Sequence, residues 1–357
     1  MKKVGIITGG GDCAGLNAVI AAIVKAGSRM GFEFIGFERG WEGLLEPMHY
    51  QKLGLSEVRG ISHLGGTILR TSNHGRFGAK VGAGDKSQID PDVLKQAKAN
   101  YDKLGLDALI VIGGDGSLSG AMQLADYGVN IVGVPKTIDN DLSSTDKTFG
   151  FSTAVQIATD AFDKVHTTAT SHDRVIFVEC MGRGAGWITL YAGISGSANA
   201  ILLPEFELDI PELVGYLKNR LLQRHRRSAI VAVSEGIKFD QRTYRDIGAS
   251  ELSFAGASEQ LMRAVEAEAP DLFEMRNVIL GHTQRGGSPN AEDRMLSKRY
   301  GVEAIEAVKQ GKFGQMVCIK DNVMQTVPIL EAVGELNLVE RNCYEYQTAQ
   351  RMGIYIN

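Results

Sequence analysis

Short β-branched runs alternate with longer amphipathic stretches along most of this chain. Val4–Thr8, Ala108–Ile112 and Ile131–Val134 have the composition of strands, and the stretches between them space their apolar residues as helices do. Such alternation predicts parallel sheets that are covered by helices on both faces. A chain of 357 residues is too long to fold around one small hydrophobic core. We therefore predict an α/β fold of two lobes, each a largely parallel sheet flanked by helices.

A second set of strands and helices follows Gly150. The expected strands are Val175–Glu179, Ala200–Leu203, Ala229–Ser234 and Val278–Leu280. Helices are expected over Phe151–Thr170 and Asn290–Lys309 in this part of the chain, and over Ser117–Tyr127 before Gly150. In sheets of this kind, ligands bind beyond the carboxyl ends of the strands. The turns that follow strands are therefore where a functional site is expected.

The charge balance and the cysteines exclude several classes of protein. Acidic and basic residues number 42 and 38, which gives a net charge of −4. A chain so balanced has no overall attraction to nucleic acid or to an anionic membrane, so we expect neither as a partner. No apolar run approaches the ~20 residues of a membrane helix, and the four cysteines show no CxxC spacing. The chain starts directly with a strand-like run and has no signal-peptide pattern, so a cytoplasmic location is expected.

Glycine is unusually frequent. It accounts for 43 of the 357 residues, whereas glycine makes up about 7% of the residues in an average protein. The first glycine-rich turn, Thr8–Asn17, leads from a strand into a helix, where backbone N–H groups favour an anion. It contains a G-x-G-x-x-A pattern at Gly9, Gly11 and Ala14, and Glu38 lies near the end of the second strand. A dinucleotide site is therefore open as an interpretation at this point, as is a tight turn that binds nothing.

The second glycine-rich turn, Gly113–Ser117, carries an aspartate among groups suited to anions. Mg²⁺ prefers one or two carboxylates together with phosphate oxygens. We therefore interpret Asp115 as a metal ligand beside a bound phosphate. The alternative is that Asp115 caps the helix that begins at Ser117.

The third turn, Pro135–Asp141, follows a strand and contains two aspartates, Asp139 and Asp141. One carboxylate is suited to take the proton of an attacking hydroxyl, while the other supports a metal or its waters. Turns rich in Asp and Asn are also common without any function.

Basic residues gather beside strands of the second lobe. Arg174 and Arg183 flank Val175–Glu179, Arg276 precedes Val278–Leu280, and His282 and Arg285 follow it. Arginine binds phosphate in a bidentate geometry, so the set suggests a clamp for a phosphosugar.

Taken together, these motifs resemble the phosphofructokinase family over nearly the whole chain. The matching segments are Gly10–Asp12 with Gly15 and Asn17, Gly65–Thr67, Gly113–Ser117, Thr137–Asp141, Met181–Arg183, Glu235 and Gly281–Pro289. The resemblance implies transfer of the γ-phosphate of ATP to the 1-hydroxyl of fructose 6-phosphate in glycolysis, with Mg²⁺. It also implies a homotetramer whose active sites lie in the cleft between two lobes. Residues 1–150 with 284–334 would form the donor-binding lobe, and 151–283 with 335–357 the lobe for fructose 6-phosphate.

The resemblance also implies roles for single residues. Asp139 would be the general base, Arg183 and Thr137 would be further catalytic residues, and Asp115 would bind Mg²⁺. The fructose 6-phosphate site would consist of Thr137, Asp139, Arg174, Met181, Gly182, Arg183, Glu235, Arg276, His282 and Arg285. The donor site would consist of Gly10, Gly11, Gly113, Gly114, Asp115, Gly116, Ser117, Trp41 and Arg76. Arg174 and Arg276 would reach the sugar from a neighbouring subunit, and a core role is the alternative for Trp41.

Two positions bear on the phosphoryl donor. Members of the family that use ATP have a small glycine where this chain has Gly116, whereas members that use pyrophosphate have aspartate there. At the second position this chain has Lys136, which resembles the pyrophosphate enzymes. Because Gly116 admits a whole nucleotide, we predict ATP as the donor, with pyrophosphate or ADP as the alternative.

Two further positions depart from the family. Asn73 stands where an arginine often contacts the donor, and Arg76 or Arg70 would have to substitute for it. His166 stands where bacterial members often have an arginine that binds effectors, which leaves allosteric control open.

Two other classes of function are weighed against the kinase. A dinucleotide oxidoreductase leaves Asp115 and Asp139 unexplained. An inactive relative would be expected to lose Asp139, Asp115 or Arg183, and all three are present.

Overall fold

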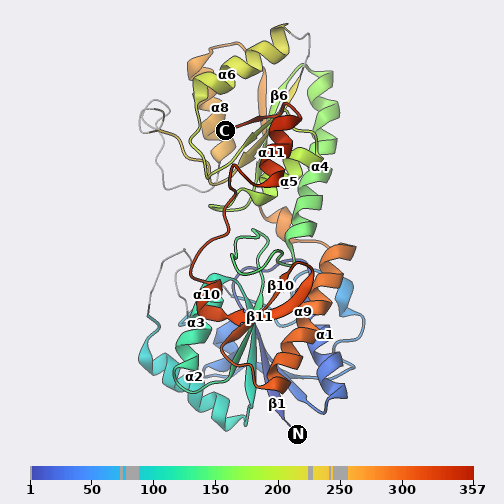
Figure 1. The fold of residues 1–357 in the computed structure, drawn as a ribbon, viewed down its shortest axis with the longest axis vertical. Coiled ribbons are helices and arrows are strands. Elements are labelled where there is room, and N and C mark those ends of the chain that lie inside the picture. Colours follow the sequence, from blue (N-terminus) through green and yellow to red (C-terminus); the bar gives the residue numbers. More distant parts are fainter. Residues whose placement is uncertain (1, 73–74, 78–87, 224–227, 241–242, 244–255) are drawn as a thin grey trace. The chain divides into compact units, whose positions relative to one another are not determined.

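The computed structural model describes residues 2–72, 75–77, 88–223, 228–240, 243 and 256–357. The chain divides into two compact units (Figure 1). Unit 1 comprises Met1–Ile138, Leu142–Thr153 and Arg285–Asn337, and unit 2 comprises Asp139–Asp141, Ala154–Gln284 and Leu338–Asn357. Which ligand each unit binds stays a prediction.

The sheet of unit 1 has the strand order β11-β10-β5-β4-β1-β2-β3. The strands are β1 (Lys3–Thr8), β2 (Glu33–Phe37), β3 (Tyr50–Leu53), β4 (Ala108–Gly113), β5 (Ile131–Pro135), β10 (Gln315–Lys320) and β11 (Val323–Pro328). All pairs are parallel except those of the two edge strands, β3 and β11. Every residue of β4 and β5 is buried, as expected for central strands covered on both faces.

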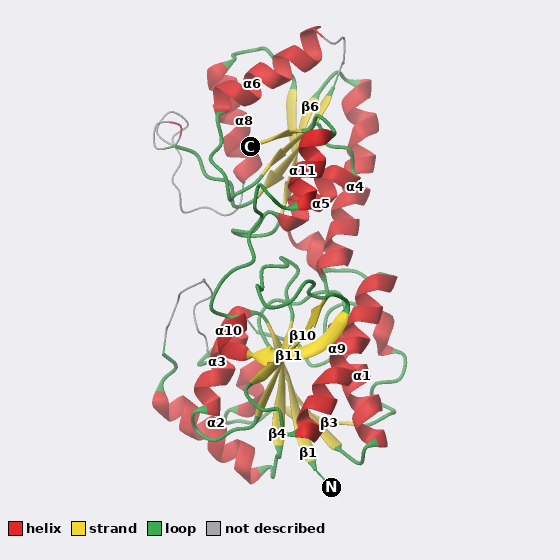
Figure 2. Ribbon diagram, viewed as in Figure 1, coloured by secondary structure: helices red, strands yellow, loops and turns green. Residues whose placement is uncertain are grey.

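Helices cover both faces of this sheet. They are α1 (Leu16–Arg29), α2 (Pro91–Lys103), α3 (Asp115–Ala125), α9 (Ala291–Gln310) and α10 (Ile329–Ala332). Figure 2 shows α1 and α9 on one face and α2, α3 and α10 on the other. The starts of two helices follow from their sequence, since Asp90 caps α2 through the N–H of Asp92, and Asn290 caps α9 through the N–H of Asp293.

Unit 2 contains a smaller sheet with the strand order β12-β7-β8-β6-β9, all pairs being parallel. The strands are β6 (Val175–Cys180), β7 (Ala200–Leu202), β8 (Ala229–Ser234), β9 (Met275–Ile279) and β12 (Tyr355–Ile356). The helices are α4 (Phe151–Ser171), α5 (Trp187–Ser195), α6 (Ile210–Lys218), α8 (Ala257–Glu268) and α11 (Tyr344–Arg351). Helices α6 and α8 lie on one face, and α4, α5 and α11 on the other (Figures 1 and 2).

The prediction of two largely parallel sheets flanked by helices is confirmed. One strand was placed wrongly: β9 begins at Met275, so Arg276 lies inside this strand and does not precede it. Helix α3 begins at Asp115, two residues before the expected start at Ser117. Both differences concern residues predicted to take part in the site.

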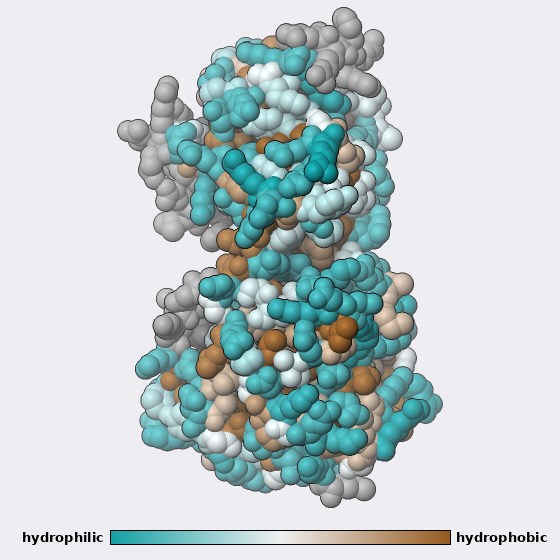
Figure 3. Space-filling view, viewed as in Figure 1, coloured by the Kyte–Doolittle hydropathy of each residue, from teal (hydrophilic) through white to brown (hydrophobic). Residues whose placement is uncertain are grey.

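Hydrophilic residues predominate on the visible face of each unit, with hydrophobic residues scattered among them (Figure 3). Within the described ranges, no helix is long and apolar enough to cross a membrane.

Candidate functional site

Three loops of unit 1 leave the same edge of its sheet. Strands β1, β4 and β5 are parallel neighbours, so their carboxyl ends lie together. The loops begin in register: the N–H of Gly9 donates to the Ile112 carbonyl (2.9 Å), and the N–H of Lys136 donates to the Gly113 carbonyl (2.9 Å). The pairing of these strands therefore brings together the first two glycine-rich turns and the start of the third.

The first two loops are packed against each other through Ser117. A Cβ added to Gly9 would lie 2.5 Å from the Ser117 Oγ, and one added to Gly113 would lie 2.4 Å from the Ser117 Cβ. Side chains larger than hydrogen would therefore separate the loops. Close backbone approach of this kind is what a phosphate-binding loop requires.

Two cations lie beside the first loop. A Cβ on Gly10 would be 3.3 Å from the Lys136 Nζ, and one on Gly11 would be 2.8 Å from an Nη1 atom of Arg285. Lys136 is buried, and Arg285 donates to the Asp12 carbonyl (3.2 Å). Residues 10–12 thus run between an ammonium and a guanidinium group, which favours an anion at this edge.

The same environment includes Cys13, which is buried three residues before the start of α1 at Leu16. Burial raises the pKa of the Cys13 thiol to about 12, although Lys136 and Arg285 act in the opposite direction. Burial likewise raises the pKa of Cys180 to about 12. Burial thus favours the neutral thiol form of both cysteines.

Asp115 does not cap helix α3. It is the first residue of the helix, and the N-cap residue is Gly114, which has no side chain to make a capping hydrogen bond. The capping alternative was therefore wrong. The N–H groups of Asp115, Gly116 and Ser117 precede the first hydrogen bond of the helix, from the N–H of Leu118 to the Gly114 carbonyl, and this helix start is suited to an anion.

A metal ion at Asp115 would need ligands from a bound molecule. In the part of the chain that the structure describes, no three His, Cys, Asp or Glu side chains are grouped to hold a metal ion. This fits Mg²⁺, which is bound by one or two carboxylates and otherwise by substrate phosphates and waters. Asp115 is half-buried beside the anion-binding helix start, so the residues present fit such an ion.

Trp41 packs in the core of unit 1. Its ring stacks on Phe77, with centroids 4.5 Å apart and planes at 9°, and its side chain is 8% exposed. Its buried Nε1 has no hydrogen-bond partner among the described residues. Trp41 thus has the core contact of the alternative interpretation, and its contact with a donor stays a prediction.

The candidates for the missing donor arginine differ in their contacts. Arg76 is held by the Glu42 carboxylate (3.1 Å) and by the Glu46 carbonyl (3.2 Å). The Arg70 carbonyl accepts from the Thr8 hydroxyl (2.8 Å), which places this residue's backbone beside the end of β1. Asn73 lies outside the described residues.

The third turn is divided between the units. Thr137 groups with unit 1, where its carbonyl accepts from the Thr148 hydroxyl (2.8 Å), whereas Asp139 groups with unit 2 and is buried. The charge of Asp139 contributes to the environment of Glu235 in the same unit. The predicted base Asp139 is therefore close enough to Glu235 for its charge to act on that carboxyl group.

A second set of predicted residues lies at the carboxyl edge of the unit 2 sheet. Met181, Gly182 and Arg183 follow β6, Glu235 follows β8, and His282 follows β9. These strands are parallel neighbours, so the structure brings the five residues to one edge. Met181 is buried, whereas Arg183 and His282 are exposed.

Glu235 holds the turn that carries Arg183. One carboxylate oxygen accepts from the N–H groups of both Gly182 (3.2 Å) and Arg183 (2.9 Å). Arg183 has a φ of 53°, a left-handed conformation that is costly for a non-glycine residue. Burial is the main reason why the pKa of Glu235 is raised, and the charges of Asp139 and Glu179 raise it further. Sequence reasoning placed Glu235 in the site but did not find this positioning contact.

Arg174 and Arg276 are not brought to this edge. Arg174 precedes β6, and Arg276 lies near the start of β9, opposite Ile176. Both guanidinium groups contact the Glu274 carboxylate, at 2.7 Å and 3.0 Å. The length of β6 separates them from Met181 by roughly 20 Å, at about 3.3 Å per residue. Within one copy of the chain, the basic set therefore forms two groups and not one clamp. Arg285, which groups with unit 1, belongs to neither.

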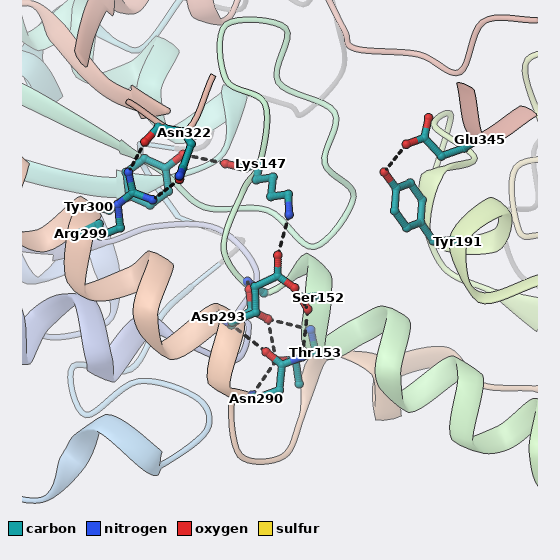
Figure 4. Close-up of polar contacts among 12 residues, drawn as sticks. Lys147, Ser152, Thr153, Tyr191, Asn290, Asp293, Arg299, Tyr300, Asn322 and Glu345 are labelled. Atoms are coloured by element: carbon teal, nitrogen blue, oxygen red, sulfur yellow. Dashed lines mark hydrogen bonds and ion pairs between the residues drawn. The ribbon is translucent and has the colours of Figure 1, made fainter. Parts of the chain in front are cut away.

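Asp293 is a further buried acid that the sequence analysis did not single out. It accepts from the N–H groups of Gly150 (2.9 Å) and Thr153 (2.7 Å) and from the Thr153 hydroxyl (Figure 4). It thereby fixes the start of α4 at the end of the loop that follows the third turn. Its position three residues after the helix cap Asn290 was the available signal.

Comparisons with known proteins agree on one family. A family model described as phosphofructokinase matches residues 3–308. The ATP-dependent 6-phosphofructokinase of Chloroflexus aurantiacus is 43% identical over 358 residues, covering 99% of this chain and 97% of that relative. The pyrophosphate–fructose 6-phosphate 1-phosphotransferase of Streptomyces coelicolor is 44% identical over 352 residues, covering 96% and 98%. The solved structure of the pyrophosphate-dependent phosphofructokinase of Marinobacter aquaeolei has a TM-score of 0.79 at 18% identity, covering 99% of this chain and 92% of that one, and bears on the fold alone.

Proposed function

Because the chain belongs to the phosphofructokinase family, we propose that it is an ATP-dependent 6-phosphofructokinase. It transfers the γ-phosphoryl group of ATP to the 1-hydroxyl of fructose 6-phosphate in glycolysis, in the cytoplasm. The relatives named for ATP use, at 43% identity over nearly the full length, support this function. The observation that carries it is the edge of unit 1, where two cations and a helix start surround a close-packed glycine loop.

Unit 1 binds the donor. Residues Gly10, Gly11 and Gly113–Ser117 offer backbone N–H groups, and Lys136 and Arg285 add positive charge on either side of the first loop. Phosphoryl transfer depends on such positioning and charge stabilisation more than on covalent chemistry by the protein. Arg285 was predicted to bind the sugar. Its hydrogen bond to the Asp12 carbonyl supports a role in holding the donor loop at least as well.

ATP is the donor because Gly116 leaves the helix start open. Gly116 is the second residue of α3, so a carboxylate there would sit among the N–H groups that receive a phosphate. Lys136 does not argue against ATP, since an ammonium beside Gly10 is suited to the terminal phosphate of either donor. The relative named for pyrophosphate use, at 44% identity, keeps pyrophosphate as the second candidate.

Unit 2 binds the sugar through Met181, Gly182, Arg183, Glu235 and His282. Asp139 takes the proton of the 1-hydroxyl as that oxygen forms its bond to the γ-phosphorus and the bond to the bridging oxygen of ADP breaks. Thr137 supports the acceptor loop, and Arg183 offsets negative charge that builds up in the transition state. Arg174 and Arg276 serve the site of a neighbouring subunit in a homotetramer.

Asp115 would hold Mg²⁺ together with donor phosphates. When bound, the ion neutralises phosphate charge. The chain's own contribution is to keep Asp115 beside the N–H groups of the α3 start, so that the donor lies across both.

The test is a coupled assay of the purified chain with fructose 6-phosphate and Mg²⁺, with ATP, ADP or pyrophosphate supplied separately. Fructose 1,6-bisphosphate formed with ATP alone supports the proposal. Product with pyrophosphate alone would overturn ATP as the donor while leaving the sugar site in place. Absence of product with all three donors would overturn the phosphotransferase function itself.

A further inference from the structure

Unit 1 contains a cavity of about 380 Å³ that no part of the proposed reaction uses. It lies between the start of α9, the loop that contains Asp146 and Lys147, and the turn between β10 and β11. Its volume falls within the range of roughly 300–1,000 Å³ that is typical of small-molecule pockets.

The walls of the cavity are fixed by hydrogen bonds. Arg299 donates to the side chain (2.7 Å) and the carbonyl (2.6 Å) of Asn322 at the β10–β11 turn (Figure 4). The hydroxyl of the buried Tyr300 donates to the Lys147 carbonyl (2.6 Å) and also contacts the Thr145 hydroxyl (2.8 Å). The cavity is therefore a preformed feature of the fold, which reduces the entropy cost of binding.

Its charges are of two kinds. Lys147 and Glu292 form an ion pair at 2.6 Å, so these two charges offset each other. Arg299 is different, since its hydrogen bonds go to two neutral oxygen atoms of Asn322, and it makes no ion pair with any described residue. Asp146 accepts only the N–H of Asp321 (2.7 Å) and makes no ion pair within the described ranges either.

The remaining wall is apolar. Met295, Leu296 and Ile319 line the cavity, and Met295 is 62% exposed although it is a large hydrophobic residue. The exposed Met295 lies beside one positive and one negative group that make no ion pair among the described residues, an arrangement complementary to a molecule that carries both charges and an apolar body.

We propose that this cavity binds a small zwitterion with an apolar side chain, of the class of the aliphatic or aromatic α-amino acids. The carboxylate pairs with Arg299, which has three of its five donors left after the two bonds to Asn322. The ammonium group pairs with Asp146, and the side chain covers Met295 and Leu296.

The test is isothermal titration calorimetry on the full chain without ATP or sugar, so the result does not depend on the proposed kinase activity. L-leucine and L-phenylalanine are the probes, and at least one is expected to bind with a Kd of about 1 mM or tighter. Leucinamide lacks the carboxylate and 4-methylpentanoate lacks the ammonium group, so each is expected to bind at least about tenfold more weakly than leucine.

Three variants connect binding to this cavity. Asp146→Asn keeps an acceptor for Asp321 but removes the charge, and Arg299→Gln removes the cation; each is expected to weaken binding at least about tenfold. Because Arg299→Gln also loosens the turn, Met295→Trp serves as a second route that fills the cavity and leaves the turn contacts intact. Met352→Trp, at a methionine that is 60% exposed in unit 2, is the matched control and should bind as the wild type does.

Three results would overturn the proposal. One is that neither amino acid binds the wild-type chain up to about 10 mM. Another is that both single-charge analogues bind as tightly as leucine, and the third is that Met295→Trp binds leucine as tightly as the wild type.

Discussion

Replacing Glu235 with alanine removes the oxygen that holds the Gly182–Arg183 turn. That oxygen accepts two backbone N–H groups, at 3.2 Å and 2.9 Å, and Arg183 is held with a φ of 53°. Hydrogen bonds to a charged group contribute about 1.5–3 kcal/mol each. Glu235 is only half-buried, so water compensates part of the loss and the lower end of that range applies.

Two bonds at about 1.5 kcal/mol give about 3 kcal/mol. If the turn must be in place for Arg183 to meet the transition state, this corresponds to a fall in kcat/KM for fructose 6-phosphate of roughly 150-fold. The value of kcat/KM with ATP held constant is measured in the coupled assay. Glu235→Gln is the matched control because its amide oxygen still accepts both N–H groups, and it should lose far less.

A fall of less than about threefold in Glu235→Ala, which is under 1 kcal/mol, would refute the reasoning. So would equal losses in the alanine and glutamine variants, because they would show that the charge matters and the anchoring of the turn does not. Thermal unfolding of both variants separates a general loss of folding from a local loss of the turn.

Three further predictions use the same assay. Asp139→Ala should lower kcat by roughly 10²–10⁴-fold, the usual range for a general base, with little change in the KM for the sugar; wild-type turnover would contradict that role. Gly116→Asp should reduce kcat/KM for ATP far more than for pyrophosphate, and unchanged ATP kinetics would remove the basis for ATP as the donor. Arg276→Ala should raise the KM for fructose 6-phosphate about tenfold or more through a lost phosphate contact, whereas Arg263→Ala, a similarly exposed arginine on α8, should not; a steady KM in Arg276→Ala would contradict the intersubunit clamp.

The central strands were predictable because a strand that is buried on both faces consists almost entirely of apolar residues. β4 and β5 are short, continuous apolar runs, and in an α/β chain such runs are typical of central strands. Strand β11 was not predicted, because it is an edge strand in which every residue is exposed or half-buried. The segment Val323–Pro328 contains two polar residues, and its apolar residues show no clear period that would distinguish a strand from a loop.

The loops of the candidate site were predictable for a similar reason. Turns that follow the strands of a parallel sheet lie at one edge, so Gly9 and Gly113 could be placed at the same edge from the sequence. That they are direct neighbours depends on the pairing of β1 with β4, which was not predicted. The arrival of Arg285 beside Gly11 does not follow, because it depends on where a segment distant in sequence returns to the sheet. The same is true of Asp293, whose buried carboxylate is recognisable only when the start of α4 is seen against it.

Arg174 and Arg276 show how an extended strand limits what one copy of the chain can do. Their sequence neighbours suggested a single clamp with Arg183, but β6 runs between Arg174 and Arg183, and its length of roughly 20 Å is far beyond the reach of an arginine side chain. Both guanidinium groups converge on Glu274, which keeps two positive charges close together at the opposite edge of the sheet. If these arginines take part in binding the same sugar as Arg183, they do so from another copy of the chain. The kinetic effect of Arg276→Ala is therefore also a test of assembly, because a chain held as a monomer should show no further loss from this substitution.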